Sequence, residues 1–146
     1  RTLISEELLK LKLKPLSVIS STAYINKEVS LGQGIQVMPN SVINYYSKIG
    51  SFSIINTSAT VDHECNLGKG VHIMGGASLA GRVKLNDYVT VGTNATIIPD
   101  LQINEGSYVG AGSVVIKNIK KNEIVVGNPS NFLKKNTHFY DLSFFN

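Results

Sequence analysis

The stretch "INYYSKIGSFSIINTSATVDHECNL", residues 43–67, carries an aliphatic residue at every sixth position. The same spacing extends in both directions, and every sixth residue from Ile19 to Val115 is Ile, Leu or Val. A period of six without insertions is typical of a repeat architecture and not of isolated helices or strands. The sequence therefore predicts a solenoid built from short, equal units.

Each unit also has a second apolar position and a turn signal. Four residues after each aliphatic residue, from Ala23 to Ile119, the side chain is again small or aliphatic, which predicts a second inward column. Gly, Asn, Asp, Ser or Ala follows the aliphatic residue directly in most units, which predicts a corner with positive φ or a side-chain-backed turn there. Three units form a coil of about 18 residues, stacked at about 4.8 Å. The predicted class is all-β, a parallel β-helix.

The two ends of the prism need caps, because open strand edges invite association. The segment 5–14, "SEELLKLKLK", has acids first and lysines later, with Pro15 beyond, and predicts a short amphipathic helix. After Ile119 the register shifts by three at "KNE". We expect a helical remnant or cap over 1–15, the β-helix over 16–128 and a capping extension over 129–146, whose aromatic residues are Phe132, Phe139, Tyr140, Phe144 and Phe145.

Composition narrows the classes of partner. The net charge of +4 comes from scattered Lys and Arg without a basic run, so we expect anionic small molecules and no nucleic acid. No apolar stretch approaches the roughly 20 residues of a membrane span, and the single cysteine, Cys65, fits a reducing cytoplasm. The chain begins without Met, and we expect it to be part of a longer protein.

The stacking of coils predicts which side chains meet across neighbouring coils. His63 falls beneath Gly81, which leaves space above the imidazole, and Asn56 precedes His63 by one strand. A ladder of small residues runs parallel to the prism axis at Gly75, Thr93 and Ala111. This ladder predicts a narrow, shallow groove.

Four stretches resemble the C-terminal domain of the sugar acetyltransferase family that contains sialic acid O-acetyltransferases and UDP-4-amino-sugar N-acetyltransferases. They are "INTSATVDHE" (55–64), "VHIMGGASLAG" (71–81), "VGAGSVV" (109–115) and "VVGNPS" (125–130), and the similarity covers residues 16–135 in register. The resemblance implies a left-handed β-helix and acetyl-CoA-dependent transfer to a sugar or nucleotide sugar. It implies that His63 is the general base, that Glu64 raises its basicity and that Asn56 lies in the same active site. It also implies that His72, Gly81, Thr93 and Ala111 contact acetyl-CoA.

The chemistry of the residues agrees with this resemblance. Acyl transfer from a thioester needs a base that titrates near neutrality, which histidine does, and an adjacent carboxylate such as Glu64 can set the tautomer. The oxyanion needs a donor, which the backbone N–H of Gly76 or Gly81 could supply, and the resemblance favours Gly81.

We expect the pantetheine arm of acetyl-CoA to follow the ladder, with Gly76 beside it. Its phosphates would end near lysines of the C-terminal coils, namely Lys117 and Lys134 with Lys120, Lys121 and Lys135. We also expect a homotrimer with the active site between neighbouring chains.

Two other interpretations stay open. Some prism proteins of the γ-carbonic anhydrase type bind zinc through three histidines, but only His63 and His72 lie in the repeat and His138 lies in the tail, so no metal is expected. The prism could instead be an inactive assembly or regulatory module. Cys65 occupies an inward position and is expected to be core. The acceptor sugar, and whether an amine or a hydroxyl is acetylated, stay undecided.

Overall fold

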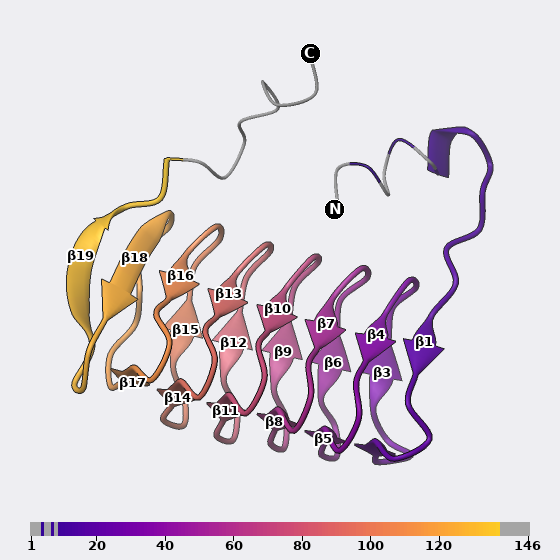
Figure 1. Cartoon of the computed structure of the whole chain (residues 1–146), viewed down its shortest axis with the longest axis horizontal. Helices are drawn as coiled ribbons and strands as arrows, with labels where there is room; N and C mark the ends of the chain where they lie inside the picture. Colours follow the sequence, from indigo (N-terminus) through magenta and orange to yellow (C-terminus); the bar gives the residue numbers. More distant parts are fainter. Residues whose placement is uncertain (1–3, 5–6, 8, 138–146) are drawn as a thin grey trace.

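The structure of the protein is a computed structural model that describes residues 4, 7 and 9–137. These residues form a three-sided prism of stacked coils, a left-handed parallel β-helix, with an antiparallel hairpin at its C-terminal end (Figure 1). The predicted fold class is confirmed. No helix in the described part of the chain is long and apolar enough to cross a membrane.

Short strands repeat on three sheets, here called A, B and C after their order along the chain. Sheet A contains, in spatial order, β1 (Val18–Ile19), β4 (Gln36–Val37), β7 (Ile54–Ile55), β10 (His72–Ile73), β13 (Thr90–Val91), β16 (Tyr108–Val109), β18 (Glu123–Val126) and β19 (Asn131–Lys135). Sheet B contains β2 (Tyr24–Ile25), β5 (Val42–Ile43), β8 (Thr60–Val61), β11 (Ser78–Leu79), β14 (Thr96–Ile97) and β17 (Val114–Val115). Sheet C contains β3 (Ser30–Leu31), β6 (Lys48–Ile49), β9 (Asn66–Leu67), β12 (Lys84–Leu85) and β15 (Gln102–Ile103).

Neighbouring coils pair in one constant register, in which each residue lies beside its counterpart in the next coil. His72 of β10, for example, pairs with Ile54 of β7 and with Thr90 of β13. Both predicted inward columns are buried from Ile35 and Val37 onward, except for the half-buried Leu101. Buried serines of the second column donate to backbone carbonyls, as Ser47 Oγ does to the carbonyl of Asp62 at 2.7 Å. The core is therefore a continuous apolar column with its polar groups satisfied.

The chain turns at three kinds of corner, named A/B, B/C and C/A by the sheets they join. Of the two expected devices, positive φ falls three residues after the aliphatic position and not one, whereas a side-chain-backed turn does occur there, as at Asp62, whose Oδ1 accepts the His63 N–H at 2.8 Å. The residue directly after the aliphatic one also donates its N–H to the next coil, as Asn44 does to the Val61 carbonyl at 2.9 Å. The positive-φ residues include Tyr46, Glu64 and Arg82, whose types give little sequence signal for this conformation.

The last coil is shorter than the others. Ile119 bridges to Ile103 and Ile124 pairs with Tyr108. The two residues of each pair are separated by two fewer positions in the sequence than paired residues of the preceding coils. The predicted shift of three residues after Ile119 is therefore wrong: the shift is two residues and lies before Ile119. Beyond it, β19 pairs antiparallel with β18 and covers the edge of sheet A.

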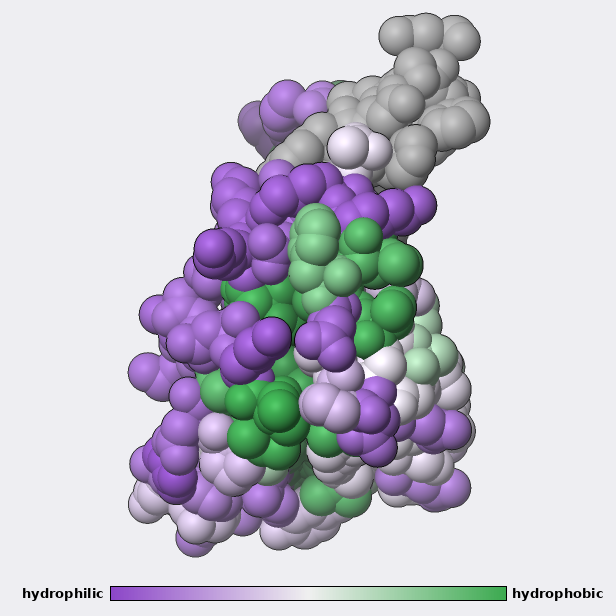
Figure 2. Space-filling model, turned by 90° about the vertical axis from the view of Figure 1, so that its left-hand side faces the viewer, coloured by the Kyte–Doolittle hydropathy of each residue, from purple (hydrophilic) through white to green (hydrophobic). Residues whose placement is uncertain are grey.

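The ends of the prism are partly open. Helical conformation occurs at Ile4, Glu7, Leu9 and Lys10, and the chain turns at Lys12, so the predicted helix over 5–14 ends early. The first coil stays exposed, with Ile19 at 48%. At the other end, Figure 2 shows apolar surface bordered by polar side chains, and its exposed apolar residues include Ile116, Val126, Phe132 and Leu133. The predicted packing of Phe139, Tyr140, Phe144 and Phe145 lies outside the described residues.

Close stacking of the coils predicts that two glycine substitutions differ in their effect on stability. A Cβ at Gly92 would lie 2.6 Å from the Ala111 nitrogen and 2.7 Å from the Val109 oxygen, both backbone atoms that cannot move alone. We expect Gly92→Ala to lower the free energy of unfolding by about 1–3 kcal/mol, the usual cost of overpacking. The control, Gly75→Ala, places its Cβ at an ordinary contact distance of 3.4 Å from the Thr57 oxygen and should cost less than about 1 kcal/mol. Urea unfolding measures both, and equal losses would contradict the stacking argument.

Candidate active site

His63 lies at the B/C corner between β8 and β9, where three consecutive residues fix the local backbone. The carboxylate of Asp62 accepts the His63 backbone N–H at 2.8 Å and also accepts from Asn44 Nδ2 at 3.0 Å. Glu64 follows with a φ of 58°, and its N–H donates to the Tyr45 carbonyl of the preceding coil at 3.0 Å. The corner is thus tied to the coil below by both backbone and side chain.

The imidazole of His63 is held from three directions. Its Nδ1 lies 2.9 Å from Glu64 Oε2. The Tyr45 ring stacks on it with centroids 5.4 Å apart and planes 11° from parallel. On the side of the next coil, a Cβ added at Gly81 would lie 2.5 Å from His63 Nε2, so only glycine leaves room for the ring. The structure therefore brings together His63, Glu64 and Gly81.

This arrangement is chemically suited to proton transfer. Because Nδ1 faces the carboxylate, an Nδ1–H tautomer donates to Glu64 and leaves Nε2 as the basic nitrogen. The His63 side chain is 26% exposed, so a substrate can reach it, while the Glu64 side chain is 50% exposed. An oriented, accessible imidazole of this kind can act as a general base.

Sequence reasoning missed the residues that surround this pair. Arg82 and Asp100 follow Glu64 at intervals of one coil, and Arg82 donates to Asp100 through Nε at 2.6 Å and Nη2 at 2.8 Å. This hydrogen bonding lowers the pKa of Asp100 and raises the pKa of Arg82, and smaller electrostatic effects come from His63 on Asp100 and from Glu64 on Arg82. Arg82 and Asp100 lie one and two coils above Glu64, and Tyr45 lies one coil below His63. The repeat alone would therefore have identified these neighbours.

The predicted donor groove lies at a different corner. Gly75, Thr93 and Ala111 stack along the A/B corner, with Asn94 N donating to the Gly75 carbonyl at 3.1 Å and Gly112 N to the Thr93 carbonyl at 2.8 Å. Gly76 has a φ of 67° there. Asn56 lies on the same A/B corner, where its Oδ1 accepts the Thr57 N–H at 2.8 Å. Within one chain the structure does not bring these residues to His63, because the two corners are separated by one side of the prism, about 18 Å for six extended residues.

The remaining predicted residues are spread over other parts of the prism. His72 lies on β10 in sheet A, half-buried between coils. Lys117 follows β17 at the B/C corner and Lys134 lies on β19, so neither is on the A/B corner with the ladder. Lys121 pairs with Glu105 at 2.9 Å and Lys135 with Glu123 at 3.2 Å. Lys120 is exposed next to the C-terminal hollow that it lines.

Cys65 is buried in the core, and its Sγ lies 3.2 Å from the Ala80 carbonyl. Burial raises the pKa of the Cys65 thiol to about 11, so the thiol stays protonated at neutral pH and is a poor nucleophile. Among the described residues, no three His, Cys, Asp or Glu side chains come together as a metal site would require.

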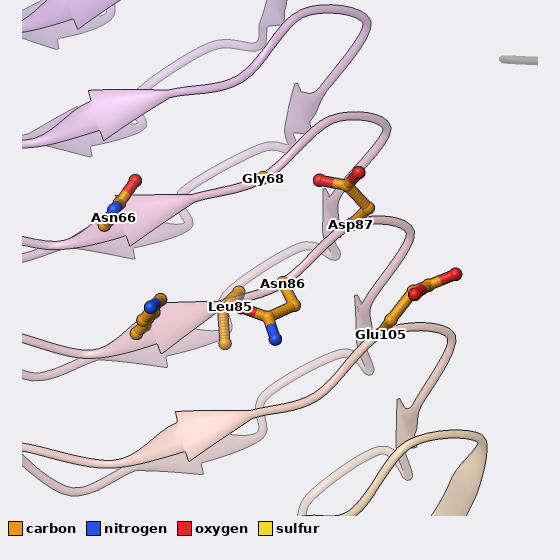
Figure 3. Close-up of a pocket in the computed structure, with 7 residues that line it drawn as sticks. Asn66, Gly68, Leu85, Asn86, Asp87 and Glu105 are labelled. Carbon is orange, nitrogen blue, oxygen red and sulfur yellow. The ribbon is translucent and has the colours of Figure 1, made fainter.

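A hollow on sheet C lies away from His63. It has a volume of about 330 Å³ and opens on sheet C, where Asn66, Lys84 and Asn86 border it and Asp87 and Glu105 lie towards the C/A corner (Figure 3). Asp87 Oδ1 accepts the Lys69 backbone N–H at 2.9 Å, and Asn86 Nδ2 donates to Asn104 Oδ1 at 3.1 Å. Much of its polar lining is therefore engaged within the prism, and none of the predicted site residues lines it.

Comparison with solved structures finds sugar acetyltransferases. A perosamine N-acetyltransferase from Caulobacter crescentus, in complex with CoA and GDP-perosamine, is 31% identical with a TM-score of 0.89, over 90% of this chain and 63% of that chain. The acetyltransferase domain of PglB from Neisseria gonorrhoeae is 34% identical with a TM-score of 0.88, over 90% and 64% of the two chains. WeeI from Acinetobacter baumannii is 33% identical with a TM-score of 0.84, over 90% and 66%.

The chain thus spans a little under two thirds of the length of these neighbours. No protein-family model matches the chain, and no curated protein matches it. A maltose O-acetyltransferase from Clostridium difficile shares the fold at 25% identity with a TM-score of 0.69, over 75% of this chain and 71% of that chain. The structural neighbours of the chain are therefore sugar acetyltransferases of the hexapeptide-repeat, left-handed β-helix type.

Proposed function

We propose that this chain is the acetyl-transferring part of an acetyl-CoA-dependent acetyltransferase that acts on an amino or hydroxyl group of a sugar or nucleotide sugar. The observation that carries the proposal is the His63 imidazole, with Nδ1 on Glu64 and Nε2 beside Gly81. Neighbours in complex with CoA and GDP-perosamine, or with acetyl coenzyme A, support the choice of substrates. No metal takes part in the proposed reaction.

The proposed reaction is direct transfer with one base. The acceptor nitrogen or oxygen attacks the thioester carbon while His63 Nε2 removes its proton, and Glu64 stabilises the imidazolium that forms. The tetrahedral oxyanion accepts a hydrogen bond from a backbone N–H, for which Gly81, beside His63 Nε2, is the proposed donor. Collapse of the intermediate breaks the carbon–sulfur bond, and the imidazolium returns its proton to the leaving thiolate of CoA. One base serves an amine or a hydroxyl, so the proposal covers both.

The proposed donor path follows the A/B ladder. Thr93 and Ala111 are exposed and Gly75 is half-buried, so a pantetheine arm meets no bulky side chain along them. Because one chain keeps this ladder about one prism side from His63, we propose that neighbouring chains of a homotrimer complete each site. Asn56 would then reach the reaction centre from the partner, together with the ladder. Lys117 and Lys134 stay candidates for phosphate contacts near the C-terminal coils.

Replacing the proposed base should abolish most of the activity. We expect His63→Ala to lower acetyl transfer about 100-fold or more, the usual contribution of a general base, with unchanged acetyl-CoA affinity. Glu64→Gln should cost less. Release of CoA thiol with GDP-perosamine as probe acceptor measures transfer, and calorimetry measures affinity. Lys84→Ala, on the exposed face of sheet C, is the control. Wild-type turnover in His63→Ala would place the base elsewhere.

Blocking the ladder should abolish donor binding. The indole of Ala111→Trp would cover the ladder next to Thr93. We therefore expect Ala111→Trp to weaken acetyl-CoA binding by about 100-fold or more. Circular dichroism should show an unchanged fold, because Ala111 is exposed. Calorimetry that finds undiminished affinity in folded Ala111→Trp would exclude this path.

Shared sites predict complementation between two inactive variants. Light scattering should give about three times the chain mass of 15.8 kDa. When His63→Ala and Ala111→Trp chains are co-refolded in equal amounts, about one quarter of the sites in a random trimer combine an intact base with an intact ladder from the neighbour. We therefore expect about one quarter of wild-type activity from the mixture. A monomer mass, or a mixture as inactive as its components, would contradict the shared site.

A further inference from the structure

Three charged residues form one ladder at the His63 corner. Glu64, Arg82 and Asp100 occupy the same position in three successive coils and have φ values of 58°, 60° and 64°. Because the backbone conformation and the register repeat, their side chains leave the prism at the same place in successive coils, about 4.8 Å apart. Arg82 therefore lies between two carboxylates.

The two carboxylates have different partners. Arg82 donates to Asp100 through two nitrogens, at 2.6 Å and 2.8 Å, in the bidentate geometry that is the strongest form of this contact. Glu64 instead accepts from His63 Nδ1 at 2.9 Å. Glu64 and Asp100 are each one coil away from Arg82 along the ladder, so a guanidinium that reaches Asp100 can also reach Glu64.

We propose that Asp100 is a positioning residue that holds Arg82 away from Glu64 and so reserves Glu64 for His63. The role rests on the proposed function of His63 as a base. Without Asp100, the guanidinium would be one coil from a carboxylate that can accept it bidentately, which a single imidazole N–H cannot match. Glu64 would then turn towards Arg82, and His63 would lose the contact that selects its Nδ1–H tautomer.

The other groups facing His63 do not offer Arg82 a comparable partner. Tyr45 stacks on His63 from the coil below and Tyr46 packs edge-on against Tyr45, and neither side chain is a carboxylate that could accept the guanidinium bidentately. The Asp62 carboxylate already accepts from the backbone of His63 and from Asn44. Lys117, at the same corner in the last coils, is a further cation and not an acceptor.

The test compares Asp100→Asn with the double variant Arg82→Gln/Asp100→Asn. In Asp100→Asn, ¹⁵N NMR of the imidazole in alkaline buffer should show the Nδ1–H tautomer of His63 reduced about twofold or more. The double variant removes the competing cation and should restore the wild-type tautomer. Melting temperatures should stay unchanged, because exposed ion pairs contribute little to stability. Glu105→Gln breaks the matched surface pair with Lys121 at another corner and should leave His63 unchanged.

Kinetics give a second readout. Asp100→Asn should lower kcat about threefold or more with the KM for acetyl-CoA unchanged, and the double variant should recover it. An unchanged tautomer in Asp100→Asn, or a double variant as impaired as the single one, would overturn the proposal. If the NMR result is as expected but the wild-type protein neither binds acetyl-CoA nor releases CoA thiol with sugar or nucleotide-sugar acceptors, the positioning role stands and the proposed reaction fails.

Discussion

The hydrogen bonds between coils are the constraint on which the rest of the structure depends. Each coil donates and accepts along its whole length, at corners as well as in strands, as the bonds from Glu64 to Tyr45 and from Arg82 to His63 show. A shift by one residue would turn the aliphatic column out of the core, so the register cannot drift. Every side chain consequently has a fixed neighbour one coil away.

This constraint explains why a site can be built on short loops. The corners are two-residue turns, and isolated turns of this size would not hold an imidazole still. At His63 the coil below supplies Tyr45 and Asn44, and the coil above supplies Gly81. The neighbouring coils therefore hold the corner rigid, as packed helices hold loops in larger enzymes. The imidazole is consequently oriented before substrate arrives.

Much of this could be predicted from the sequence, because periodicity reports the register directly. The six-residue spacing predicts the prism, and stepping one coil up from His63 predicts its contact with Gly81. One coil down from His63 lies Tyr45, and one and two coils up from Glu64 lie Arg82 and Asp100. Only glycine or a small residue marks open space in a sequence, so these larger neighbours give no signal of a site. The sequence could not predict positive φ at residues such as Tyr46 or Arg82, because there the hydrogen bonds of the neighbouring coils override local preference.

The last coil and the packing between chains are where periodicity stops being informative, whereas the repeat itself predicts that His63 and the Gly75 ladder lie on different faces. Two residues are missing before Ile119, where aliphatic residues on both sides of the gap fit either register, so the pattern places the shift too late. For Asn56 and the Gly75 ladder, the repeat specifies a corner, and that corner is not the one that carries His63. A rigid register cannot bring the two corners of one chain closer by bending. Any chemistry that needs both must therefore come from the packing of prisms against one another, which side chains on the outer faces control and the inward repeat does not.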